Sequence, residues 1–122
     1  MKHETQTWLN IADQDLAAAQ GLLDLDLYAP TIFHCQQAVE KYLKGIWAET
    51  HTDGVPPKVH DLVELLNGLD FDLPDKRRFL SDLSRQAVST RYDNHSEFPR
   101  ALAVEVLQES RVLCEQLRLR LT

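Results

Sequence analysis

The residue types best suited to chemistry gather in one polar segment late in the chain. Arg91 and His95 are separated by three residues, which are Tyr92, Asp93 and Asn94. A guanidinium group can bind a phosphate through two parallel hydrogen bonds, and an imidazole can transfer protons near neutral pH. The segment could therefore bind a phosphate at Arg91 and move protons at His95. The alternative is a solvated loop whose arginine pairs with a carboxylate of the same protein.

Three further basic residues could contact a phosphate. Arg85 lies in the stretch 76–100, which holds six of the thirteen Lys and Arg residues. Lys41 and Lys44 lie in an earlier polar stretch, where Glu40 and Lys44 are four residues apart and share one face of a helix. An exposed pair of this kind contributes only about 0.3–0.5 kcal/mol. For the two lysines we favour a structural ion pair over a phosphate contact.

No spacing in the sequence indicates a metal or cofactor site. His34, Cys35 and His51 are scattered, and no Cys-x-x-Cys, His-x-x-x-His or Glu-x-x-His pattern places two ligands on one face. The four glycines do not form a phosphate-binding loop. We therefore expect a protein that uses neither a metal nor a cofactor.

Helices must position these residues. Apolar side chains recur every three or four residues, and no segment alternates as a strand would. We expect helices at 5–25, 30–49 and 60–69, a fourth that starts after a cap at Asp72 and ends near 89, and a last helix to about 121 with Ser96 as its cap and Pro99 in its first turn. The segment 90–98 is then a loop. The prediction is an all-α protein, an up-and-down antiparallel bundle of four to five helices in a single domain, residues 1–122.

Charge and composition exclude several classes of protein. A net charge of −6 argues against coating of nucleic acid through bulk electrostatics, although a local basic site remains compatible with it. The two cysteines, Cys35 and Cys114, fall among apolar helical neighbours and indicate free thiols in a reducing compartment. No apolar run resembles a signal peptide or a membrane span. We expect a cytoplasmic protein without membrane contact.

Four groups of residues together resemble a known family. They are Tyr28, the helix Gln36-Gln37-Ala38-x-Glu40-Lys41-x-Leu43-Lys44, the triplet His60-Asp61-Leu62, and Arg91-Tyr92. In this order they resemble the HEPN domain (higher eukaryotes and prokaryotes nucleotide-binding). The resemblance spans nearly the whole chain.

The resemblance implies a helical homodimer that pairs with a minimal nucleotidyltransferase, often as the toxin of a toxin–antitoxin pair. It also implies metal-independent RNA cleavage by an Arg and a His that are separated by four to six residues near the dimer cleft. Here Arg91 and His95 are the candidates, although three residues separate them, and Asp93 stands where Arg-Tyr is usually followed by proline. Contacts to RNA or nucleotide would come from a further set of residues: Tyr92, Asp93, Asn94, Arg85, Lys41 and Lys44.

Two other functions fit the same residues. The domain could be a non-catalytic module that binds a nucleotide or positions a substrate. It could also be a structural dimer whose polar helix packs against the transferase.

Overall fold

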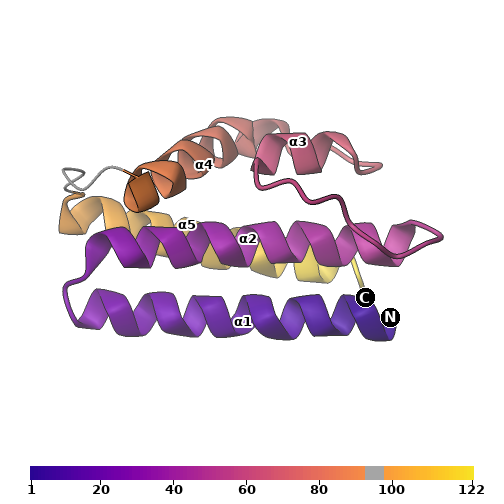
Figure 1. Cartoon of the computed structure of the whole chain (residues 1–122), viewed down its shortest axis with the longest axis horizontal. Helices are drawn as coiled ribbons and strands as arrows, with labels where there is room; N and C mark the ends of the chain where they lie inside the picture. Colours follow the sequence, from indigo (N-terminus) through magenta and orange to yellow (C-terminus); the bar gives the residue numbers. More distant parts are fainter. Residues whose placement is uncertain (93–97) are drawn as a thin grey trace.

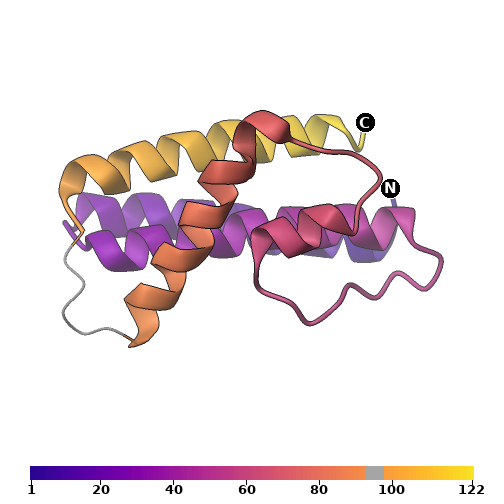
Figure 2. The ribbon, with the colours of Figure 1, turned by 90° about the horizontal axis from the view of Figure 1, so that it is seen from above.

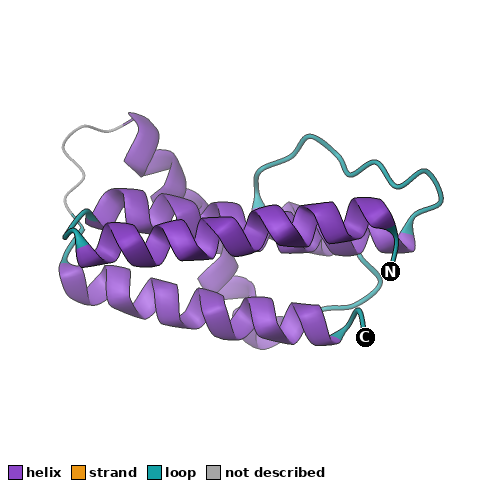
Figure 3. Ribbon diagram, turned by 90° about the horizontal axis from the view of Figure 1, so that it is seen from below, coloured by secondary structure: helices purple, strands orange, loops and turns teal. Residues whose placement is uncertain are grey.

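The protein is built from helices and their connections. The computed structural model describes the backbone of residues 1–92 and 98–122 and the side chains of 1–90 and 98–122. The elements are α1 (His3–Asp24), α2 (Tyr28–Thr50), α3 (Leu62–Asn67), a short 3₁₀ turn η1 (Pro74–Lys76), α4 (Arg77–Tyr92) and α5 (Arg100–Leu119). Figure 3 shows helix and loop, and no strand, in this described part. The prediction of an all-α bundle is confirmed.

Three long helices form the base of the molecule. α1 and α2 lie side by side and antiparallel, and α5 packs along them in the direction of α2 (Figure 1). α3 and α4 cover one side of α2, and α4 crosses the bundle at an oblique angle (Figure 2). α2 is therefore the central helix, and every other long helix packs against it.

The core follows the apolar stripes of the sequence. It includes Ala12, Leu16, Ala19 and Leu23 of α1, and it continues through Ile32, Val39, Leu43 and Ile46 of α2 and Leu113 and Leu117 of α5. Trp8 lies at the margin of the core, because Leu9 occupies the fully buried position beside it. Among the described helices, none is long and apolar enough to cross a membrane.

The helix ends differ from the predicted ones where local hydrogen bonds decide them. α3 starts at Leu62 and not at His60, since the Asp61 side chain accepts a hydrogen bond from the Glu64 amide at 3.0 Å and caps the helix. Pro99 is the residue before α5, and the predicted cap Ser96 lies outside the described residues. α1 continues through Gly21 to Asp24 without an early end.

The largest difference concerns α4. The predicted loop begins at residue 90, but α4 extends to Tyr92 and includes Arg91. Thr90 donates its hydroxyl to the Ala87 carbonyl at 2.7 Å, so its polar group is satisfied within the helix. The residues at this end of α4 are polar and show no apolar periodicity, which is why the pattern of the sequence did not reveal it.

Candidate functional site

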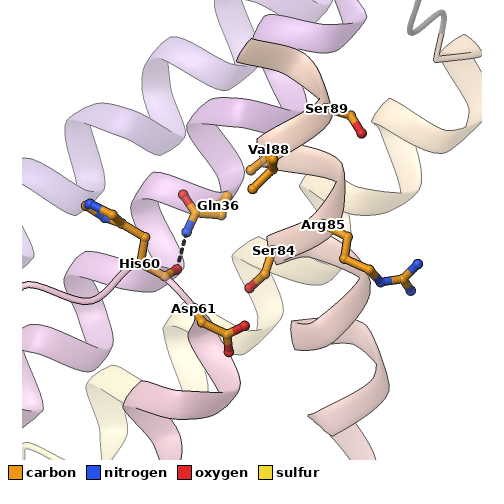
Figure 4. A pocket seen from close by; sticks show the side chains of 8 residues that line it. Gln36, His60, Asp61, Ser84, Arg85, Val88 and Ser89 are labelled. Atoms are coloured by element: carbon orange, nitrogen blue, oxygen red, sulfur yellow. Dashed lines mark hydrogen bonds between the residues drawn. The ribbon is translucent and has the colours of Figure 1, made fainter. Parts of the chain in front are cut away.

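A pocket of about 410 Å³ opens between α2, the start of α3 and α4. Figure 4 shows how its residues lie: Ser84 and Val88 point toward α2 and the start of α3, whereas Arg85 and Ser89 point away. Its volume lies within the usual range of small-molecule sites, about 300–1,000 Å³. The residues that line it are Gln36, His60, Asp61, Ser84, Arg85, Ala87, Val88 and Ser89.

Gln36 forms a fixed wall of this pocket. Its amide nitrogen donates to the His60 carbonyl at 2.9 Å and to Glu40 Oε1 at 3.1 Å, and its oxygen accepts from Gln37 at 2.8 Å. The polar atoms of Gln36 are therefore engaged within the protein. Gln36 therefore shapes the pocket, and the hydrogen bonds that select a ligand must come from other side chains.

Ser84 and Asp61 keep hydrogen-bonding capacity that the fold does not use. The Ser84 hydroxyl oxygen accepts from the Leu62 amide at 3.0 Å, which ties α4 to the start of α3. A hydroxyl that accepts can still donate its own hydrogen. Asp61 Oδ1 accepts from Glu64, and within the described residues Oδ2 has no hydrogen-bond partner. Among the described residues of the pocket, the Ser84 hydroxyl can thus donate to a ligand and Asp61 Oδ2 can accept from one.

Arg85 lies at the rim of the pocket. Its guanidinium pairs with Asp82 one turn earlier on α4, and its side chain is 74% exposed. Figure 4 shows it directed away from Gln36 and His60. An exposed ion pair of this kind is weak, so an incoming anion can compete with Asp82 for the guanidinium.

Of the two predicted catalytic residues, Arg91 and His95, the structure describes the backbone of Arg91 alone. Arg91 and Tyr92 belong to the last turn of α4, one turn beyond Ala87 and Val88 of the pocket. His95, together with Asp93 and Asn94, lies outside the described residues. The structure therefore locates the backbone of Arg91 next to the pocket and does not test its predicted pairing with His95.

The whole-chain comparisons settle the family. A model of the HEPN domain matches residues 5–119. This chain belongs to the HEPN domain family. It is also similar to a solved structure, the crystal structure of TT1696 from Thermus thermophilus, at 31% identity and a TM-score of 0.81. That match covers 96% of this chain and 98% of the other. A comparison with curated proteins found no match.

Two of the motifs that carry the HEPN resemblance, the Gln-Gln helix and His60-Asp61-Leu62, meet in a polar network around the buried Glu40. The Glu40 carboxylate accepts from Lys44 Nζ at 3.1 Å, and His60 Nδ1 lies 3.1 Å from its other oxygen. The Lys44 side chain is only 8% exposed, and its ammonium lies 5.8 Å from the ring centre of Trp8. This network connects α2 with α1 and with the segment before α3, and Lys44 is enclosed by it.

Lys41 is engaged in a second network of the HEPN fold. Its ammonium lies 2.5 Å from Oδ2 of the buried Asp15, and His34 Nδ1 lies 2.9 Å from the other oxygen of that carboxylate. Since Asp15 belongs to α1 and both partners belong to α2, the network joins the two helices. For Lys41 and Lys44 these contacts support the structural ion pairs that the sequence favoured.

The pocket itself was not apparent in the sequence. Ser84, Ala87 and Val88 are not among the predicted site residues, and the sequence marks Asp61 through the motif His60-Asp61-Leu62, where a helix start is favoured over a catalytic His–Asp pair. One signal is present, namely that Ala87 and Val88 are the apolar residues of an otherwise polar stretch, 84–90. Within the described residues, no group of three or more His, Cys, Asp or Glu side chains could hold a metal ion.

Proposed function

We propose that this HEPN protein cleaves RNA without a metal ion, as a homodimer in which each copy contributes Arg91 and His95. The observation that carries the proposal is its membership of the HEPN family over residues 5–119, since Arg followed by His is the working motif of the family's ribonucleases. The position of Arg91 in the last turn of α4, beside the pocket, is consistent with a site at this end of the helix. Arg85, Tyr92, Asp93 and Asn94 then surround the RNA backbone.

The chemistry follows from what an arginine and a histidine can do. One His95 takes the proton of a ribose 2′-hydroxyl, whose oxygen attacks the adjacent phosphorus. The bond from phosphorus to the 5′-oxygen breaks, and a protonated imidazole, that of His95 in the second copy, supplies a proton to the leaving oxygen. The Arg91 guanidinium balances the charge that develops on the phosphoryl oxygens. The products are a cyclic phosphate and a free 5′-hydroxyl.

The test uses pure protein, a mixed-sequence RNA and a chelator. We expect Arg91→Ala and His95→Ala each to reduce the cleavage rate by at least about 100-fold, the usual contribution of a general acid–base or an oxyanion donor. Matched controls are Arg78→Ala, at an exposed arginine of α4, and His3→Ala at the start of α1, which should cut RNA like the parent. Equal cleavage by all four variants would overturn the assignment of Arg91 and His95.

We further propose that the protein is the toxin of a pair whose partner is a minimal nucleotidyltransferase, and that both act in the cytoplasm. This rests on the family alone. Expression in a bacterial host should arrest growth, and coexpression of a transferase encoded next to it should restore growth and copurify with the protein. Normal growth with the HEPN protein alone, at a level detectable in the cell, would contradict the toxin assignment.

A second candidate function is a non-catalytic nucleotide-binding or substrate-positioning module. The observation that favours it is the pocket of about 410 Å³, which described residues of one copy line. Under this function the protein binds nucleotides but leaves RNA intact. Calorimetric titration of the parent with the four ribonucleoside monophosphates, alongside the cleavage assay, separates the two functions.

A further inference from the structure

We infer that the pocket between α2 and α4 is a subsite for a nucleobase that carries an amino group next to a ring nitrogen, as adenine and cytosine do. The inference deepens the proposed function and rests on it, because it identifies what the site recognises beside the phosphate. It draws on the unused hydrogen-bonding groups, the charge and the apolar wall of the pocket.

The charges that face the pocket disfavour a phosphate inside it. Asp61 contributes a carboxylate, and the guanidinium of Arg85 is directed away (Figure 4). The nearby ammonium of Lys44 is enclosed in its pair with Glu40 and Trp8. An anion placed in the pocket would therefore meet an acceptor and no facing cation among the described residues. An uncharged ligand that donates a hydrogen bond avoids this penalty.

The two available polar groups match one edge of such a base. The free Oδ2 of Asp61 can accept from an exocyclic amino group, and the Ser84 hydroxyl can donate to the neighbouring ring nitrogen. In Figure 4 these two side chains extend toward the same space, Asp61 from the residue before α3 and Ser84 from α4. A base that presents a carbonyl oxygen in place of the amino group would put an acceptor against the carboxylate, which is unfavourable.

Val88 and Ala87 supply an apolar surface for the face of the base. Val88 is 51% exposed although it lines the pocket, and Ala87, the residue before it, is buried and also lines the pocket. Covering an exposed apolar side chain with a planar ring removes apolar surface from water and stabilises the complex. The pocket therefore combines an apolar side with a few placed polar groups, which is the usual make-up of a small-molecule site.

The position of the pocket agrees with a phosphate bound outside it. α4 continues from Val88 to Arg91 in one turn, and Arg85 stands at the rim. A base in the pocket would leave its sugar and phosphate close to these two arginines. The base could belong to RNA or to a free nucleotide, and the recognition chemistry is the same for both.

The first experiment needs no RNA and no catalysis. The full chain is titrated with adenosine, cytidine and uridine and followed through its backbone amide NMR signals. We expect adenosine and cytidine to shift signals of Gln36, Asp61, Ser84 and Val88 and to bind more tightly than uridine. Loss of one hydrogen bond to a charged group corresponds to about a 10-fold difference. No shift at millimolar nucleoside, or shifts confined to other surfaces, would overturn the subsite.

Two variants address the assigned roles. Asp61→Asn keeps the helix cap, because asparagine caps as well as aspartate, but places an amide where the ligand needs an acceptor. We expect about 10-fold weaker binding of adenosine. Val88→Trp should fill the pocket and abolish binding, whereas Val112→Trp on α5, at a residue equally exposed at 49%, should not change it. Unchanged adenosine binding by both Asp61→Asn and Val88→Trp would refute the inference.

A second experiment, RNA cleavage by the parent and by Asp61→Asn, distinguishes a base of RNA from that of a free nucleotide. It also distinguishes failure of the subsite from failure of the proposed ribonuclease activity. If the base belongs to RNA, Asp61→Asn should alter which bases flank the cleavage sites. Adenosine binding with unaltered cleavage sites would identify a free nucleotide as the occupant of the same subsite. RNA cleavage without nucleoside binding would overturn the subsite alone. Nucleoside binding without any RNA cleavage by the parent would overturn only the proposed ribonuclease activity.

Discussion

His60 Nδ1 lies 3.1 Å from Oε1 of Glu40, so a largely exposed histidine before α3 contacts a carboxylate of α2 that is only 5% exposed. The same carboxylate accepts from Gln36 and from Lys44, each at 3.1 Å. The two family motifs, the Gln-Gln helix and His-Asp-Leu, therefore meet at one side chain. Together they hold the segment before α3 against α2. Because His60 and Asp61 line the pocket, these contacts also fix one side of it.

Replacement of Glu40 should destabilise the protein strongly. In Glu40→Gln the Lys44 ammonium stays enclosed and loses its counter-charge, and breaking such a buried pair costs about 3–5 kcal/mol. Urea unfolding followed by circular dichroism measures the change in the free energy of unfolding. The matched control is Glu105→Gln, at an exposed glutamate of α5, which should differ from the parent by less than about 0.5 kcal/mol.

A double variant shows whether the orphaned charge is the cause. Glu40→Gln combined with Lys44→Met removes both charges and should recover a substantial part of the lost stability, because no unpaired ammonium remains in the interior. If Glu40→Gln is as stable as Glu105→Gln, the network contributes nothing and the interpretation of the motif is wrong.

The fold could be predicted because it follows from apolar periodicity. The stripes in α1, α2 and α5 are visible in the sequence, and most of their residues form the core, with Trp8 at its margin. The end of α4 was not predictable in this way, because residues 89–92 are polar and carry no apolar stripe. Nor does the sequence show that Asp26, in the turn after α1, adopts a positive φ of 61° and pairs with Arg100 across 74 residues.

The candidate site could be predicted only in part, for a geometric reason. The pocket joins Gln36, Asp61 and Ser84, which lie far apart in the sequence and meet only after α3 and α4 fold back onto α2. The spacing of residues within one segment of the sequence cannot predict a contact between segments so far apart. The ion pair of the polar helix, in contrast, could be predicted, because Glu40 and Lys44 are four residues apart and this spacing is a local pattern.

Gly68 should tolerate no side chain, although its backbone is unstrained. A Cβ at this position would lie 2.2 Å from Cζ3 of Trp47. The indole cannot move freely, since it stacks on His51 with ring centres 3.8 Å apart. We expect Gly68→Ala to lower the free energy of unfolding by about 1–3 kcal/mol, the usual cost of overpacking.

The control for this prediction is another glycine of the same chain. A Cβ at Gly21 of α1 would meet nothing within 4 Å, so Gly21→Ala should stabilise the protein by about 0.5–1 kcal/mol through better helix propensity. Both variants are measured by urea unfolding. Equal stability of Gly68→Ala and the parent would show that Trp47 can be displaced without cost.

Tyr42 should make stability fall at alkaline pH. Its hydroxyl donates to Asp13 at 2.6 Å and accepts from Arg118 at 2.8 Å, and burial followed by the Asp13 hydrogen bond raises its pKa above the ordinary value of 10.0. A raised pKa means that the folded state holds the proton more tightly, so this contribution is complete below about pH 10 and is lost as the pH rises toward the folded pKa.

A comparison of two Tyr→Phe variants isolates the contribution of Tyr42 to the loss of stability at alkaline pH. Tyr42→Phe should show a shallower loss of stability above about pH 10 than the parent, together with a loss of about 1 kcal/mol at neutral pH from the missing hydrogen bonds. Tyr28→Phe keeps Tyr42 and should retain the steeper loss. Both variants keep Cys35 and Cys114, so the thiols contribute equally. Identical alkaline profiles for Tyr42→Phe and the parent would contradict the assignment.

Cys35 and Cys114 should be unreactive while the protein is folded. Both are buried free thiols, and burial raises the pKa of Cys35 to about 12 and that of Cys114 further. Since the thiolate is the reactive form, a thiol reagent near pH 8 can react with these cysteines only after the protein unfolds. Labelling of the folded protein should therefore be at least about 1,000-fold slower than labelling in urea. Val112→Cys places an exposed thiol on α5 as a matched control and should add one group that reacts at once. Rapid labelling of the parent before any denaturant is added would show that the helices around α2 and α5 open far more readily than this packing allows.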